Sequence, residues 1–161
     1  FLYMKTKQHI ISSLFLMPII FAFTKNYFFA VLSGIITILV DIDHIIDFII
    51  TQKKIDTLSN MHQAFETFKY VKKNYFIFHS WEIIILLFFG YYFFKNEIFI
   101  ILCFSIALHL LLDQIYNSFF LKKYSLKLFF YFFIYRLYHK FDVLSLRKYG
   151  HLIKEDEMIY E

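Results

Sequence analysis

The chain has 161 residues, of which 60% are hydrophobic and 24% aromatic, against about 45–50% apolar residues in soluble domains. This composition indicates a membrane protein. The net charge of +4 comes largely from lysines that flank apolar runs, which indicates membrane topology and gives no reason to expect a nucleic-acid partner. A single cysteine, Cys103, excludes a disulfide framework, and the scarcity of Gly and Pro predicts one helical domain over residues 1–161.

Four apolar runs predict membrane-spanning helices. They cover residues 9–23, 27–50, 75–94 and 98–120, and runs of about 20 residues can cross the hydrocarbon core of a bilayer. The first run is short and contains Pro18, although residues 1–8 extend it. The turns at residues 24–26 and 95–97 are tight, so we expect two antiparallel hairpins.

Two further segments are expected at the membrane surface. Residues 51–74 are too polar to cross, and Met61, Phe65 and Phe68 recur there at helical spacing. Residues 126–138 form a shorter aromatic run that we expect to lie at the interface or to pack on the bundle. The predicted fold is therefore all-α: a polytopic membrane bundle of about four transmembrane helices (core 5–121) with an interfacial or cytoplasmic segment, 122–161.

The positive charges predict the direction of insertion. The two tight turns carry only Lys25 and Lys95, whereas basic residues crowd residues 53–73 and follow the fourth run. Because positively charged loops stay in the cytoplasm, both ends of the four-helix core and its central loop are expected there.

Histidines and carboxylates interrupt the apolar runs at one depth, toward the predicted cytoplasmic side. Such groups cost about 2.5–3.5 kcal/mol each inside a membrane, so they imply a function. Many are spaced i, i+3 or i, i+4 and share a helix face. Imidazole and carboxylate ligands from facing helices suit zinc, with iron or manganese as alternatives. The predicted metal ligands are His9, Asp41, Asp43, His44, His79, His109 and Asp113.

Several roles stay open at this point. Asp43 is either a ligand or a residue that orients His44, and His9 is either a ligand or an exposed interfacial residue. Asp47 is left outside the site, as a residue that snorkels or pairs with Lys53 or Lys54. The two hairpins also resemble each other in the placement of these groups, which hints at a pseudo-twofold site with one or two ions.

The order of these motifs resembles the bacterial inner-membrane, metal-dependent hydrolase-like family, also described as LexA-binding, inner-membrane-associated hydrolases. The resemblance covers roughly residues 5–120 and rests on an early His, an Asp-x-Asp-His, a His-Ser and a His-x-x-x-Asp, here His9, Asp41 to His44, His79-Ser80 and His109 to Asp113. Val40 stands where the family usually has Pro, and the Thr and His-Arg that precede the family's His-Ser are absent. The resemblance implies a multi-pass protein of the bacterial inner membrane with metal-dependent hydrolase activity.

We therefore expect a metal-dependent hydrolase of an ester or phosphoester, with a divalent transition metal, by preference zinc, that activates water. Glu82 is the predicted general base, with a ligand role as the alternative. The depth of the site favours a lipid or lipid-linked substrate that diffuses within the bilayer. A non-catalytic metal-stabilised scaffold or partner-binding protein and a cation or proton transporter are the alternative functions; the apolar outer halves of the helices weigh against transport.

Overall fold

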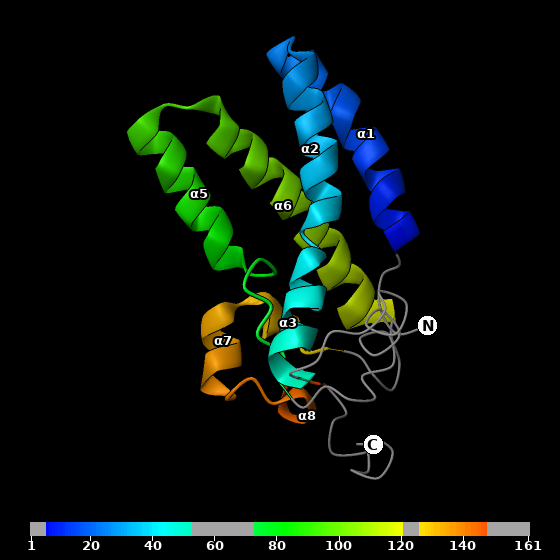
Figure 1. Cartoon of the computed structure of the whole chain (residues 1–161), viewed down its shortest axis with the longest axis vertical. Helices are drawn as coiled ribbons and strands as arrows, with labels where there is room; N and C mark the ends of the chain where they lie inside the picture. Colours follow the sequence, from blue (N-terminus) through cyan, green and yellow to red (C-terminus); the bar gives the residue numbers. More distant parts are fainter. Residues whose placement is uncertain (1–5, 53–72, 121–125, 148–161) are drawn as a thin grey trace.

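The computed structural model describes residues 6–52, 73–120 and 126–147 (Figure 1). The expected surface helix around Met61 lies outside these ranges. The described ranges are helical apart from loops, turns and two isolated β-bridges, which confirms the all-α prediction. The main helices are α1 (Thr6–Thr24), α2 (Tyr27–Leu39), α3 (Ile42–Gln52), α5 (Trp81–Phe94) and α6 (Glu97–Ile115), which continues as a π-helix (Tyr116–Phe120). A 3₁₀-helix (Leu128–Tyr131), α7 (Phe133–Tyr138) and α8 (Val143–Leu146) follow.

The two expected hairpins are present and share one kind of turn. In each, a lysine in the left-handed conformation ends the first helix, Lys25 with φ 53° and Lys95 with φ 51°. The next residue, Asn26 or Asn96, caps the second helix by accepting the N–H two residues later, at 2.9 and 3.0 Å respectively. Asparagine at an N-cap satisfies a backbone donor that the helix leaves free. The Lys-Asn pair thus explains how such short turns reverse the chain.

Two helical stretches are long and apolar enough to cross a membrane. They are Tyr27–Thr51, 25 residues, and Glu97–Phe119, 23 residues, or roughly 35 Å each at 1.5 Å per residue. The first is bent where α2 gives way to α3, because the N–H groups of Asp41 and Asp43 bond three residues back instead of four. The bend places Asp41 at a break in the helix.

The third apolar run differs from the prediction. We expected a helix from Tyr75, but α5 begins only at Trp81, and residues 74–80 are not helical. The physical reason is that side chains from other elements bind the backbone of this segment, as described below. The α5 helix is therefore 14 residues long, and it and α1 are shorter apolar helices.

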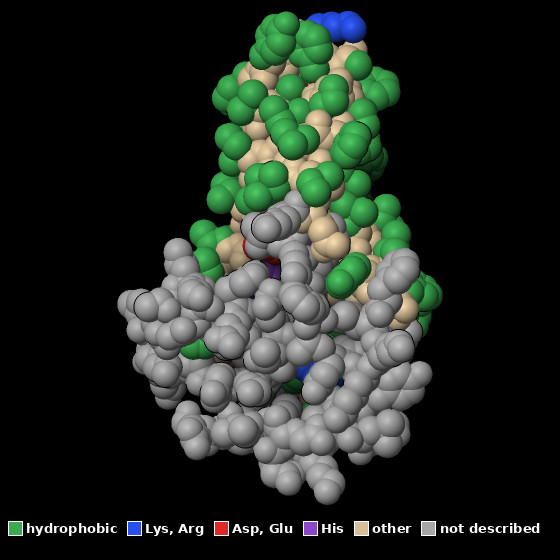
Figure 2. Space-filling model, turned by 90° about the vertical axis from the view of Figure 1, so that its right-hand side faces the viewer, with side chains coloured by type: hydrophobic (Ala, Val, Ile, Leu, Met, Phe, Trp, Pro, Cys, Tyr) green, Lys and Arg blue, Asp and Glu red, His purple; other side chains and the backbone are tan. Residues whose placement is uncertain are grey.

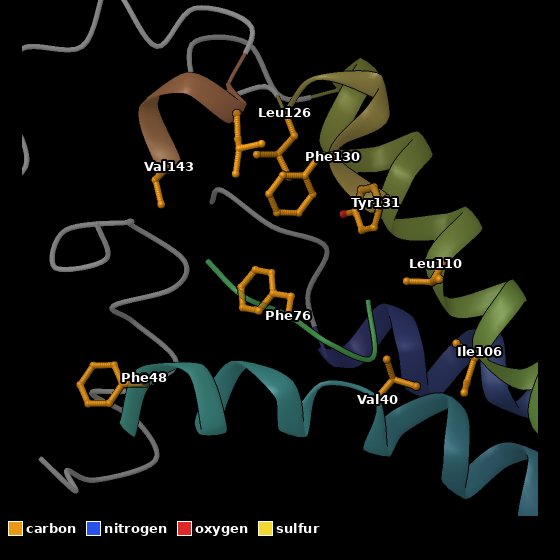
Figure 3. Close-up of a cluster of buried hydrophobic side chains, with 10 residues drawn as sticks. Val40, Phe48, Phe76, Ile106, Leu110, Leu126, Phe130, Tyr131 and Val143 are labelled. Atoms are coloured by element: carbon orange, nitrogen blue, oxygen red, sulfur yellow. The ribbon is translucent and has the colours of Figure 1, made fainter. Parts of the chain in front are cut away.

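Helices α2 and α6 pack together in the centre, each beside its hairpin partner (Figure 1). The outward faces of α1, α2, α5 and α6 expose large apolar side chains. These side chains cover the narrow upper part of the molecule in Figure 2, which we call the apolar stalk. Buried apolar side chains form a larger cluster at the other end, where loop 73–80 meets α3, α6 and the segment 126–147 (Figure 3). From that segment the cluster includes Leu126, Phe130, Tyr131, Val143 and Leu146. The segment 126–147 therefore packs on the bundle.

Gly34 allows α1 and α2 to approach closely. A Cβ atom at this position would lie 2.7 Å from Met17 Sδ and 2.9 Å from Met17 Cγ. Because a methionine side chain adapts readily, we expect Gly34→Ala to lower stability slightly. Gly34→Leu should overpack the interface by about 1–3 kcal/mol. Thermal unfolding of both variants in detergent tests this, and a Gly34→Leu variant as stable as the wild type would show that the helices are not in contact there.

Candidate metal centre

Histidine and aspartate side chains from four parts of the chain meet between the apolar stalk and the larger buried cluster. Two groups of three have donor atoms close enough together to hold a metal ion. The first group is His9, His109 and Asp113, and the second is Asp41, His79 and His109. His9 comes from α1, Asp41 from the bend between α2 and α3, His79 from loop 73–80, and the other two from α6. The helices thus bring together five of the seven predicted ligands.

Four atoms form the centre of this site, and we call them the acceptor cluster: Asp41 Oδ1, His79 Nε2, His109 Nε2 and Asp113 Oδ2. The two Nε2 atoms lie 3.1 Å apart. Asp41 Oδ1 is 3.4 Å from His109 Nε2 and 3.7 Å from His79 Nε2. Asp113 Oδ2 is 3.5 and 3.6 Å from the same two atoms. Ligands of a tetrahedral zinc ion, each about 2.0–2.1 Å from the metal, lie about 3.3–3.4 Å apart.

The far nitrogen of each imidazole is held by an acceptor. His109 Nδ1 lies 2.7 Å from the carbonyl oxygen of Thr37, and His79 Nδ1 lies 3.3 Å from Asp43 Oδ2. Because a carbonyl and a carboxylate accept hydrogen bonds, both Nδ1 atoms carry the proton. If the rings are neutral, this tautomer turns the lone pair of each Nε2 into the acceptor cluster. Metal-binding histidines are held in this way by a partner behind the ring.

The acceptor cluster therefore needs a positive charge at its centre. With neutral rings, two lone pairs face each other and two carboxylates in a buried site, and such a site is stable only if protons or a cation lie between them. Burial by itself would lower the pKa of His79, but its hydrogen bonds to Asp41 and Asp43 outweigh burial and raise that pKa above its usual value. The surroundings of His79 thus favour a positive charge at this ring.

His9 contacts the carboxylate oxygen of Asp113 that lies outside the acceptor cluster. Its Nε2 lies 3.2 Å from Asp113 Oδ1, whereas Oδ2 of the same carboxylate belongs to the acceptor cluster. The ring of His9 stacks on that of His109, with centroids 4.0 Å apart, and its Nδ1 is buried without a hydrogen-bond partner. His9 is thus buried, unlike an exposed interfacial residue. Since Thr37 occupies one nitrogen of His109, that ring has a single nitrogen for an ion, and the two groups compete for it.

Asp43 and His44 touch the site but lie outside both groups. Asp43 Oδ2 accepts the backbone N–H groups of Phe78 and His79, the latter at 3.1 Å, and contacts the ring of His79. Asp43 therefore orients His79 in this structure; we had considered a similar role toward His44. His44 Nε2 lies 3.6 Å from Asp41 Oδ1. Among the histidine and aspartate side chains that meet here, His44 and Asp41 are the most exposed, at 19% and 26%.

Glu82 binds the start of α7. Its two carboxylate oxygens accept the N–H groups of Phe133, at 2.9 Å, and Ile134, at 3.1 Å. These donors are among those that every helix leaves unpaired at its N-terminus. Glu82 belongs to neither group of metal-binding residues. Its predicted role as general base or ligand stays a prediction, and the contacts that the structure shows for it are structural.

Two residues of the surroundings were missed by sequence reasoning. Asp47 accepts the N–H of Tyr75 at 3.1 and 3.2 Å, and Lys53 and Lys54, its expected partners, lie outside the described residues. Arg136 belongs to the run that we expected to lie at the interface or to pack on the bundle. It is buried and donates to the carbonyl oxygens of Phe76 and His79. The signal for it was present, because a cation within an aromatic run is tolerated in a core only when it is paired.

Comparison with protein-family models, with curated proteins and with solved structures gives no match for this chain. The family resemblance drawn from His9, Asp41 to His44, His79-Ser80 and His109 to Asp113 therefore stays a prediction. The functional interpretation rests on the geometry of these side chains.

Asp43 and Asp47 offer a matched pair of variants. Both are buried acids of α3 that accept N–H groups of loop 73–80, but only Asp43 also contacts a histidine ring of the acceptor cluster. We expect Asp43→Asn to weaken zinc affinity about 10- to 100-fold, the usual effect of losing a partner behind a ligand, and Asp47→Asn to leave it close to wild type. Competition with a zinc chelator measures both. Equal effects of the two substitutions would contradict the role given to Asp43.

Proposed function

We propose that this protein is a membrane-bound, metal-dependent hydrolase in which Asp41, His79, His109 and Asp113 hold one zinc ion. The observation that carries the proposal is the acceptor cluster itself: two imidazole nitrogens, 3.1 Å apart, converge with two carboxylate oxygens. A divalent cation held among these atoms would replace their repulsion by favourable contacts. The partners behind the two rings, Thr37 and Asp43, support the same assignment.

The ligand set favours zinc. Two nitrogens and two oxygens suit this ion, and the distances from the two nitrogens to each other and to the oxygens, 3.1–3.7 Å, are close to the spacing of tetrahedral ligands. Iron and manganese accept the same donors with higher coordination numbers. When held by these residues, zinc would supply Lewis-acid chemistry and lower the pKa of a coordinated water to about 7, which would give a nucleophile for ester or phosphoester hydrolysis. The reaction class follows from this chemistry and from the resemblance noted above.

The exposure of the site favours catalysis over a purely structural metal. Structural zinc sites are closed by protein ligands, whereas catalytic sites keep a position open to water, so with four protein ligands the water would have to enter as a fifth ligand. The side chains of His9, His79, His109 and Asp113 are buried, while Asp41 and His44 are partly exposed. Substrate would therefore reach the ion on the Asp41 side. His44 lies on that side, so within this proposal it is better placed than Glu82 to accept a proton.

The apolar stalk supports a location in the membrane. Its long helices and exposed Phe, Ile and Leu side chains match a lipid environment, and acidic and histidine side chains are visible where the stalk ends in Figure 2. With the lysine distribution, the proposed place is the bacterial inner membrane, with a multi-pass bundle and the site toward the cytoplasm. At that depth a lipid or lipid-linked ester reaches the site by lateral diffusion.

Metal content tests the proposed centre. We expect about one equivalent of zinc in purified protein and its loss in His109→Ala, because that substitution removes an atom shared by both groups. His139→Ala is the matched control, since His139 contacts the rings of Tyr135 and Tyr138 and belongs to neither group. Elemental analysis gives the stoichiometry. Folded wild-type protein that takes up no zinc, iron or manganese would contradict the proposal.

Hydrolysis by the zinc-loaded protein in lipid vesicles tests the reaction. Long-chain fluorogenic esters and phosphodiesters are the probes, with short-chain soluble analogues beside them. We expect turnover of a long-chain probe, a loss of about 10²-fold or more in kcat for His44→Ala with the metal retained, and loss of both metal and activity for Asp113→Ala. Zinc-loaded protein inactive toward every probe would favour the scaffold alternative. Activity confined to soluble probes would contradict a lipid substrate.

A further inference from the structure

Loop 73–80 carries His79 into the metal centre without the hydrogen bonds of a helix. Its backbone groups are bound from two sides by side chains of other elements. On one side, Asp47 accepts the N–H of Tyr75, and Asp43 accepts those of Phe78 and His79. Buried backbone groups require such partners, because an unpaired one loses the hydrogen bond that water would give it. The acids of α3 thus satisfy three donors of this loop.

On the other side, Arg136 binds the acceptors of the same loop. One guanidinium nitrogen lies 3.0 Å from the carbonyl oxygen of His79. The other lies 2.7 Å from the carbonyl oxygen of Phe76 and 2.5 Å from Ser80 Oγ. The side chain is fully buried, and burial lowers its pKa only to about 10, so it remains charged at neutral pH. A planar fork of donors suits three acceptors in this arrangement.

The position of Arg136 is itself fixed by contacts of α7, and of the chain after it, with the two ends of loop 73–80. The helix that carries it, α7, begins with two N–H groups bound to Glu82, which is on the first turn of α5 directly after the loop. An isolated β-bridge between Lys73 and Asp142 ties the start of the loop to the chain after α7. These contacts hold α7, and with it the guanidinium of Arg136, in place. The guanidinium in turn binds the backbone of His79, whose side chain enters the acceptor cluster.

We propose that Arg136 is a positioning residue of the metal centre, which fixes the backbone of His79 from behind so that its ring meets His109 and Asp113. It touches no atom of the acceptor cluster and acts only through the loop. The segment 126–147, which we had expected outside the core, is in this way part of the apparatus that sets metal affinity. This inference rests on the metal centre proposed above.

Cobalt(II) bound in place of zinc reports on both affinity and geometry, because its d–d absorption depends on the ligands and their angles. We expect Arg136→Ala to weaken cobalt affinity about 10- to 100-fold and to change the absorption band. Arg136→Lys keeps the positive charge but loses the planar set of guanidinium donors. It should therefore be more stable than Arg136→Ala, bind cobalt with intermediate affinity and still show an altered band. Leu146→Ala is the control for lost stability alone, because it opens a cavity in the same segment and removes no bond to the loop.

The outcomes separate this inference from the function on which it depends. A lower melting temperature with wild-type affinity and band in Leu146→Ala, beside weaker binding and an altered band in the Arg136 variants, supports the positioning role. Unchanged affinity and band in Arg136→Lys would overturn that role and leave the metal centre standing, even if Arg136→Ala fails to fold. Wild-type protein that takes up no cobalt would overturn both.

Discussion

The structure depends on one electrostatic constraint, the meeting of four electron-rich atoms within an apolar bundle. When both rings are neutral, two imidazole nitrogens 3.1 Å apart and two carboxylate oxygens within 3.7 Å of them repel one another. In a medium of low dielectric constant that repulsion is poorly screened. A divalent ion at their centre would turn it into attraction. The costly side chains on the apolar helices then have a physical reason to be there.

Two departures from regular helix structure bring side chains into the acceptor cluster. The bend between α2 and α3 places Asp41 at a helix break, and the start of α5 is delayed so that His79 lies in a loop. Both departures lower stability unless other groups compensate, because each leaves backbone groups outside the regular hydrogen-bond pattern of a helix. Side chains compensate: Asp43 and Asp47 bind N–H groups of the loop, and Arg136 binds its carbonyls. The acceptor cluster is thus surrounded by residues that hold its side chains in place.

Sequence reasoning predicted the parts of this arrangement that depend on local pattern. Apolar runs predicted the helices, the short turns between them predicted the hairpins, and the spacing of His109 and Asp113 placed both on one face of α6. It could not predict contacts between distant segments. Nothing near Tyr75 indicates that a helix will start at Trp81, since the cause lies in Asp43, Asp47 and Arg136, up to 60 residues away. For the same reason Glu82 was predicted as a base, although its oxygens bind the start of α7.

The most direct test of the central claim is X-ray absorption at the zinc edge of zinc-loaded protein in detergent. We expect nitrogen and oxygen ligands at about 2.0–2.1 Å, with scattering from two imidazole rings that is lost when His79 and His109 are both replaced by alanine. A spectrum of zinc surrounded by oxygen alone, or one that the double substitution leaves unchanged, would contradict the assignment of the acceptor cluster as a metal centre.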